Sequence, residues 1–251
     1  MPAERGHFGP DQIVGWDGPS ADVLTKAGWA SPSGGGGGGG GTFPFTVVQQ
    51  AGFQSGGNGT SFSVTFPSAL AGSGNTAFML VACDGSSTVT APAGWTVDLN
   101  VQQNTYARFM LVHKATAGET SVTFTVGSAS SFSILFFELA GSHALDQSST
   151  GGVANTNNVV LPAITPTAGS VVFGMSCQVA NSGQTYNPVL NSMGNWTCVA
   201  VTALTSGGRA LFGHISTVAA SNVSTKPPVI SNPGGGLFAS GGIAYATFSI
   251  L

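Results

Sequence analysis

Eight consecutive glycines at residues 34–41 divide the chain into a short charged head and a long body with very little charge. Six of the fifteen Asp, Glu, Lys and Arg residues lie within the first 26 positions, and the other nine are spread over residues 42–251. A glycine run has minimal side-chain volume and no preferred backbone conformation. Because no Gly-Lys-Ser/Thr motif follows the run, it does not match a phosphate-binding loop. We interpret residues 34–42 as a linker.

The composition of the whole chain excludes several classes of function. Charged residues make up 6% of the 251 residues, against roughly 25% in ordinary soluble domains. The net charge is −3 and no basic stripe is present, so we expect no nucleic-acid partner. The longest apolar run, Phe132–Ala140, is too short to span a bilayer, so we expect no membrane insertion. The first residues lack the apolar core of a signal peptide.

The body after Thr42 has the pattern of an all-β protein. Short runs rich in Val, Thr, Phe and Ile alternate with clusters of Gly, Ser, Asn and Pro, and no run of ten residues has a convincing helical period. Short strands with frequent turns favour antiparallel sandwiches, and we predict two tandem jelly-roll-like sandwiches. The predicted strands are Phe62–Phe66, Ala77–Cys83, Trp95–Val101, Ala107–Lys114, Ser121–Val126, Ser133–Leu139, Asn158–Leu161, Ser170–Gln178, Trp196–Thr202, Arg209–Ser216 and Ile243–Ile250.

The two halves of the body contain similar phrases in the same order, which indicates an internal repeat. The phrases around Trp95 and Trp196 are one such match, and the Arg-x-x-x-x-His phrases of the two halves are another. We predict that the repeated residues are structural anchors at equivalent places: Trp95 and Trp196, Arg108 and Arg209, His113 and His214. The predicted organisation is an N-terminal segment 1–33, the linker 34–42, a first sandwich 43–145, a linker 146–155 and a second sandwich 156–251.

The N-terminal segment 1–33 contains two tryptophans in similar phrases, Val14-Gly-Trp16-Asp17 and Ala27-Gly-Trp29-Ala30. The segment is too short to bury both indoles itself, and tryptophan is a frequent anchor in protein interfaces. We predict that Trp16, Val23, Leu24 and Trp29 dock on a partner protein. The alternative is a disordered tail, since chain termini are often poorly ordered.

None of the catalytic patterns in the body is complete. Arg108 and His113 lie five residues apart in a predicted strand, so their side chains point to opposite faces. A Ser-His-Asp hydrolase would need a Gly-x-Ser-x-Gly turn between a strand and a helix, and none occurs. Glu138 is the only acid in an apolar strand, and it either faces solvent or is buried against Arg108 or Lys114. We expect no enzymatic activity.

Metal, disulfide and sugar sites are no better supported by the residue pattern. The four histidines are far apart, and neither a CxxC nor an HxxxH motif occurs, so we expect no metal and no cofactor. The three cysteines are an odd number, and the sequence leaves open whether Cys177 and Cys198 form a bridge. Trp95 and Trp196 could stack on sugars, but we favour buried anchors, and we expect any sugar contact to use segments 53–60 or 221–242.

The order of these phrases resembles the duplicated β-sandwich modules of bacteriophage virion proteins. The phrases that carry the resemblance are Pro92-Ala-Gly-Trp-Thr96 and Thr120-Ser-Val-Thr-Phe-Thr125, within residues 43–251. The second half departs from the pattern, with Gly194-Asn-Trp196 and an insertion from Ser221 to Gly242. The resemblance implies attachment to a virus particle and contact with the host surface, and it does not distinguish head from tail. We expect a location in the virion as a capsid fibre or decoration protein. We also expect a major capsid or tail protein as partner, assembly as a homotrimer and contact with a host-surface glycan.

Two other functions remain open at this point. The first is a tail-associated or tail-fibre protein that binds a host receptor. The second is a carbohydrate-binding module of a cellular protein with no virus involved.

Overall fold

The computed structural model describes residues 45–83, 88–103, 107–153, 158–180, 189–191, 197–206, 209–219, 229–231 and 243–251. This part of the chain is all-β, with antiparallel strand pairs and no helix, which confirms the predicted fold class at that level. Its strands are β1 (Val47–Thr65), β2 (Asn75–Cys83), β3 (Val89–Thr90), β4 (Thr96–Gln103), β5 (Ala107–Ala115), β6 (Ser121–Ala140), β7 (Leu145–Val153), β8 (Asn158–Val160), β9 (Val171–Ala180), β10 (Val189–Asn191), β11 (Thr197–Ser206), β12 (Arg209–Ala219), β13 (Val229–Ser231) and β14 (Ile243–Ile250).

Each predicted strand overlaps a strand of the structure. Two segments that we expected to lie outside strands are found within strands, so these two predictions are wrong. Most of the expected linker 146–155 belongs to β7, which pairs with β14. The segment 53–60, expected to be a loop, belongs to the long strand β1. Both segments are rich in Gly, Ser and Asn, residues that are depleted in strands, and pairing with an apolar neighbouring strand overrides that preference.

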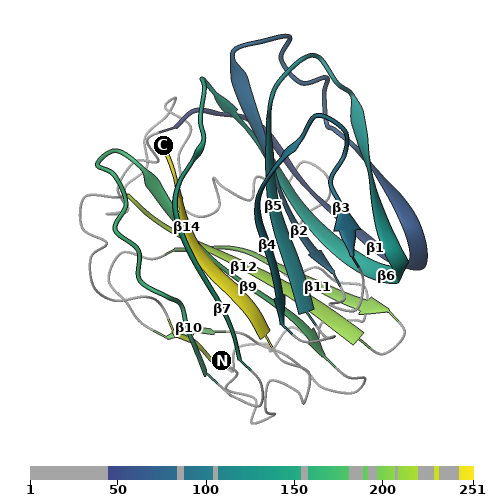
Figure 1. Cartoon of the computed structure of the whole chain (residues 1–251), viewed down its shortest axis with the longest axis vertical. Helices are drawn as coiled ribbons and strands as arrows, with labels where there is room; N and C mark the ends of the chain where they lie inside the picture. Colours follow the sequence, from purple (N-terminus) through teal and green to yellow (C-terminus); the bar gives the residue numbers. More distant parts are fainter. Residues whose placement is uncertain are drawn as a thin grey trace, which may run out of the picture.

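The strands form three sheets (Figure 1). The first has the order β1-β6-β2-β5-β4, with β3 also paired to β6. The second large sheet has the order β11-β12-β9-β14-β7, and a small sheet has the order β10-β13-β8. The two large sheets have the same construction. Read in reverse, the second sheet has the order β7-β14-β9-β12-β11, and each of its strands is the counterpart of the strand at the same place in β1-β6-β2-β5-β4.

The two large sheets pack against each other through one apolar cluster, the inter-sheet core. Strand β1 contacts β11 at one side, β4 contacts β7 at the other, and β2 contacts β9 in the middle. The sheets therefore face each other with reversed strand order, as two copies related by an approximate two-fold rotation would. The buried members of the inter-sheet core are Phe78, Leu80, Ala82, Leu99, Phe109, Leu111, Leu135, Phe137, Leu139, Val171, Phe173, Ala244, Ala246, Phe248 and Ile250.

A ladder of phenyl rings crosses the inter-sheet core. The ring centroids of Phe78 and Phe137 are 5.3 Å apart, those of Phe137 and Phe173 are 5.9 Å apart, and those of Phe173 and Phe248 are 5.1 Å apart. The three pairs are stacked, with interplanar angles of 17°, 17° and 12°. Phe78 and Phe137 belong to the first sheet and the other two rings to the second, so the ladder ties the two sheets together.

The opposite face of the first sheet carries a second apolar cluster, the outer core. Strands β1 and β6 pair along their whole length and are long enough to serve two layers. The last part of β6 pairs with β2 and carries the first part of β1 on its other side, while the last part of β1 and the first part of β6 extend beyond this sheet as a second layer. That second layer, with β3 paired to β6, covers the outer face of β2 and β5. Alternate residues Phe62, Val64, Val122, Phe124 and Val126 point into the outer core and their neighbours are exposed.

Two bulges fix the correspondence between the halves. In the β4·β5 ladder a bulge lies between Val97 and Leu99, and in the β11·β12 ladder one lies between Cys198 and Ala200. Each bulge begins two residues after a tryptophan of the sequence repeat. Val97 follows Trp95 by two residues, and Cys198 follows Trp196 by two residues. The β1·β6 and β7·β14 ladders are also interrupted at equivalent places. The strands β1, β4, β7 and β11, which end the two five-strand orders, therefore each pair with their neighbour through a bulged ladder, a device that disfavours edge-to-edge association.

Glycines with positive φ support the same alignment. Gly74 has a φ of 86° just before β2, and Gly169 has a φ of 94° just before β9. Only glycine adopts this conformation without a steric penalty. The two loops that end at these glycines both begin after a buried apolar residue, Phe66 or Leu161.

The strand register corrects the predicted correspondence of the histidines. With the bulges aligned, Thr96 pairs with His113 in the first half and Thr197 pairs with Thr217 in the second. The position that matches His113 is therefore Thr217, which lies three residues beyond His214. A shift by an odd number of residues moves a side chain to the other face of a sheet, so the two histidines are not equivalent.

The arginines of the repeated phrase are displaced in the same way. Arg108 pairs with Gln102 on β4, and the corresponding pair in the second half is Phe212 with Ala203. Arg209 pairs with Ser206, at the end of the β11·β12 ladder. The shared spacing of Arg and His in the two halves does not mark shared positions.

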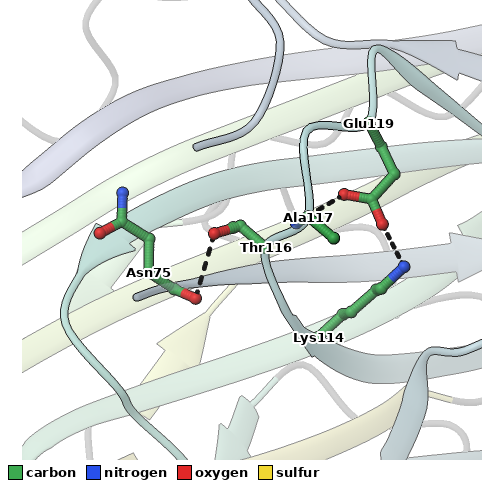
Figure 2. Close-up of polar contacts among 5 residues, drawn as sticks. All are labelled: Asn75, Lys114, Thr116, Ala117 and Glu119. Atoms are coloured by element: carbon green, nitrogen blue, oxygen red, sulfur yellow. Dashed lines mark hydrogen bonds and ion pairs between the residues drawn. The ribbon is translucent and has the colours of Figure 1, made fainter. Parts of the chain in front are cut away.

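The turn between β5 and β6 is held by polar contacts (Figure 2). The Lys114 ammonium binds a carboxylate oxygen of Glu119, whose other oxygen accepts a hydrogen bond of 3.0 Å from the amide of Ala117. The hydroxyl of Thr116 donates to the carbonyl oxygen of Asn75, 3.3 Å away, which joins the turn to the start of β2. Burial opposes the charge on Glu119, but these hydrogen bonds and the Lys114 charge outweigh it and lower the pKa of the carboxyl.

Candidate functional site

The sequence-predicted residues fall into two groups in the structure. The docking residues Trp16, Val23, Leu24 and Trp29 lie outside the described residues, as does the repeat tryptophan Trp196. For Arg209 and His214 the structure describes the backbone of β12 and nothing of the side chains. The contacts of the described members, Trp95, Arg108 and His113, and of the acid Glu138, are given below.

Trp95 is an internal residue of the outer core. Its side chain is 8% exposed and packs with the apolar residues beneath β3 and β6. The preceding turn contains Gly94 with a φ of 79°, and the amide of Trp95 donates to the carbonyl oxygen of Pro92 at 3.2 Å. A buried indole has no face available for a sugar, so Trp95 is placed as a packing residue.

Glu138 is buried among uncharged donors, which corrects the expectation that it faces solvent or pairs with Arg108 or Lys114. Its side chain is fully buried. One carboxylate oxygen accepts hydrogen bonds from the Asn75 amide group at 2.7 Å and from the backbone amide of Ala71 at 3.1 Å. The other accepts from the Gln49 amide group at 2.6 Å. The carboxylate thus fixes the loop between β1 and β2 to the edge of the sheet.

Asp146 holds the corresponding loop, the one before β9, in the second half. One oxygen accepts hydrogen bonds from the Thr167 amide at 2.8 Å, the Ser249 hydroxyl at 2.9 Å and the Ser170 hydroxyl at 3.0 Å. The other accepts from the Thr167 hydroxyl at 2.7 Å. Partial burial opposes its charge, yet the bonds from Thr167, Ser249 and Ser170 prevail and lower its pKa. Both acids therefore serve as loop anchors beside a bulge, on β6 in one half and on β7 in the other.

His113 and Asp98 form an ion-pair site at the edge of the inter-sheet core. Nδ1 of His113 lies 2.6 Å from a carboxylate oxygen of Asp98, the extra residue of the β4 bulge. The His113 ring also packs on Phe78, with centroids 5.7 Å apart, and continues the phenyl ladder. Burial is the main influence on Asp98 and raises its pKa, although the hydrogen bond and the charge of His113 act in the opposite direction.

The raised pKa of Asp98 and the lowered pKa of Asp146 predict opposite pH dependences for two matched variants. For Asp98 the stabilising contribution is complete below the ordinary pKa of 3.8 and is lost as the pH rises through the folded pKa. For Asp146 the contribution is complete above 3.8 and is lost as the pH falls through the folded pKa.

We expect Asp98→Asn to gain stability relative to the native chain as the pH rises from 3 to about 7, because the neutral amide carries no burial cost for charge. We expect Asp146→Asn to lose stability relative to the native chain over the same interval. Urea unfolding of the three proteins at several pH values measures both differences. If the two differences changed with pH in the same direction, the assignment of these carboxylates would be wrong.

Arg108, Asn100 and Gln102 form a polar strip on the outer side of the β4–β5 hairpin. Nη1 of Arg108 donates to the side-chain oxygen of Asn100 at 2.7 Å, and Nη2 donates to the side-chain oxygen of Gln102. Arg108 and His113 therefore lie on opposite faces of β5, as strand alternation predicts. Neither this strip nor the Asp98–His113 pair is visible in the residue pattern until the register of the hairpin is known.

These geometries do not complete a catalytic centre within the described residues. Asp98 and His113 are two members of a hydrolase-type arrangement, but in the described part of the chain no hydroxyl is hydrogen-bonded to the imidazole. Among the same residues no group of three His, Cys, Asp or Glu side chains is placed to hold a metal ion. The thiol of Cys83 is buried, while the side chains of Cys177 and Cys198 lie outside the description.

No helix within the described ranges is long and apolar enough to cross a membrane. Comparison of the chain with protein-family models, with curated proteins and with solved structures finds no match.

Proposed function

We propose that this protein is a structural component of a bacteriophage virion, attached through residues 1–33 and carrying its all-β body on the particle surface as a capsid fibre or decoration. The observation that supports this proposal most is the repeated construction of the body. Two sheets of the same strand order, with bulges at equivalent places, share one apolar core. The polar side chains of the described part that are hydrogen-bonded, such as Glu138 and Asp146, serve mainly to hold loops in place. This use of polar groups suits a structural protein better than an enzyme.

In this proposal the body contains two copies of a jelly-roll-like sandwich, and the second copy begins with β7 (Leu145–Val153) rather than at residue 156. The small sheet β10-β13-β8 supports this finer division, because its order repeats the order of β3, the first part of β6 and the last part of β1. Each copy would then contain a large sheet and a small one. The glycine-rich linker 34–42 would allow the body to move relative to its attachment point.

The partner would be a major capsid or tail protein, and the complete assembly a homotrimer that contacts host glycans. A low charge and an abundance of Ser, Thr, Asn and Gly on a stable β body are compatible with repeated exposure at a particle surface. A tail-associated protein that binds a receptor would have the same low charge and the same composition. A cellular carbohydrate-binding module would also have this composition, but it would not need residues 1–33 for attachment to a particle.

Purified particles provide the test of this proposal. Mass spectrometry of virions, combined with labelled antibodies against the described body, should detect the protein and place the label on the head. Label confined to the tail would support the tail-fibre alternative. Absence of the protein from virions that are otherwise complete would overturn the proposed function in favour of a cellular protein.

A further inference from the structure

The central strand β14 of the second sheet is polar on the face that points away from the inter-sheet core. The alternate residues Tyr245, Thr247 and Ser249 lie on this outer face, because their neighbours along β14 are members of the inter-sheet core. The aligned ladders place Thr247 where the first half has Phe136, a member of the outer core. A short polar side chain therefore stands in the middle of the second sheet where the first sheet has a phenyl ring.

The residues paired with Thr247 also differ from their counterparts in the first half. Thr247 pairs with Ser149 on β7 and with Gly174 on β9. At the same places the first half has Ala51 and Met79, which both belong to the outer core. The row of paired residues through Thr247 thus combines a second hydroxyl on one side with a residue that has no side chain on the other.

The hydroxyl of Thr247 is buried and lacks a partner. Thr247 is 2% exposed, and within the described part of the chain its Oγ1 atom has no hydrogen bond. A buried hydroxyl without a partner is costly, and folded proteins satisfy nearly all such groups with protein atoms or with ordered water. The described protein groups do not supply the partner that this hydroxyl needs.

A pair of the same kind in the first half shows the alternative, a direct bond between the two hydroxyls. Ser63 on β1 pairs with Thr123 on β6, and their hydroxyl oxygens are 2.8 Å apart. Ser149 and Thr247 are paired in the same way on β7 and β14, yet their hydroxyls are not bonded to each other. Directly paired residues have Cβ atoms about 4.5–5.5 Å apart, so one small molecule between two such hydroxyls can bond to both.

We propose that Thr247 and Ser149 bind an ordered water molecule on the outer face of the second sheet, beside Gly174. Water suits both hydroxyls, because it can donate a hydrogen bond to one and accept a hydrogen bond from the other. Internal waters in proteins bridge buried polar groups that would otherwise have no partner. The site would connect the edge strand β7 to β14 on a face that the first half fills with apolar side chains.

The test is a count of long-lived internal waters by magnetic relaxation dispersion of the water oxygen nucleus, with the full native chain and the variant Thr247→Val. The substitution removes the hydroxyl and keeps the shape of the side chain, so the fold should accept it. We expect the variant to hold one long-lived water fewer than the native chain. Ser149→Ala should lose the same water, and the double variant should lose no more waters than either single variant.

Thr76→Val is the matched control, because Thr76 is 3% exposed and its hydroxyl is bonded within the protein. That hydroxyl donates to the carbonyl oxygen of Gly141 at 3.1 Å and accepts from the backbone amide of His143 at 2.9 Å. The control should therefore hold as many internal waters as the native chain.

Equal counts for the native chain and Thr247→Val would overturn the proposed site. A higher urea midpoint for Thr247→Val than for the native chain would overturn it as well, because a hydroxyl that has no partner is better replaced by a methyl group. Both measurements use the purified chain, so their outcome is independent of whether the protein is found in virions.

Discussion

Replacement of Phe137 by alanine is expected to lower the free energy of unfolding by about 3–5 kcal/mol, the usual cost of deleting a buried phenyl ring. Phe137 is 1% exposed and occupies the centre of the inter-sheet core. Its ring stacks on Phe78 in its own sheet and on Phe173 in the other, so one deletion interrupts both contacts. Urea unfolding followed by fluorescence and by circular dichroism would measure the loss.

The matched variant is Phe248→Ala in the second half. The aligned ladders place Phe248 where Phe137 lies, because each residue pairs with the corresponding residue of β2 or β9, Phe78 or Phe173. Both variants should cost a similar amount, and both should unfold in a single transition, because the two sheets share one core. Two separate transitions, with Phe137→Ala shifting only the first, would contradict the shared core and indicate two independent domains.

Replacement of Glu138 by alanine is the second change with a large expected effect. The substitution removes the acceptor for three donors, those of Gln49, Ala71 and Asn75. A buried donor left without a partner costs about 1–3 kcal/mol. Because these three donors are half-buried, each counts at the lower end of that range, and we expect a total loss of about 3 kcal/mol in the free energy of unfolding. Hydrogen exchange should also show faster exchange of the Ala71 amide.

Glu119→Gln is the control for this prediction. Glu119 lies at the β5–β6 turn and is partly exposed, and its partner Lys114 is partly exposed too. Exposed ion pairs contribute about 0–1 kcal/mol, so this variant should have little effect. If Glu138→Ala cost no more than Glu119→Gln, the buried carboxylate would not be the anchor of the β1–β2 loop.

The strands could be predicted from the sequence because their apolar periodicity is strong. The segment Phe132–Leu139 and its counterpart Ile243–Ile250 form central strands, where burial on both faces leaves long apolar runs. Strand β7 was missed because Ser148, Ser149, Gly151 and Gly152 give no strand signal by themselves. An edge strand needs less intrinsic preference when a neighbour such as β14 supplies the pairing.

The candidate site residues were harder to predict because register is not visible in a single sequence. Asp98 and His113 are fifteen residues apart, and only the β4 bulge brings the carboxylate onto the imidazole. Similarity of phrases also misled the comparison of His113 with His214, since a match in letters does not fix which face of a strand a side chain occupies. The inter-sheet core likewise depends on long-range packing that no local pattern reports.

In the function that we propose, this chain belongs to a virus particle and is held there by its first 33 residues. The most direct test is to supply a chain that begins at Thr42, or the double variant Trp16→Ala with Trp29→Ala, during particle assembly and to count copies in purified virions. We predict a folded body with unchanged thermal stability and a loss of incorporation in both cases, because tryptophans are common interface anchors. Incorporation of the shortened chain at the normal copy number would contradict attachment through residues 1–33 and would assign attachment to the β body.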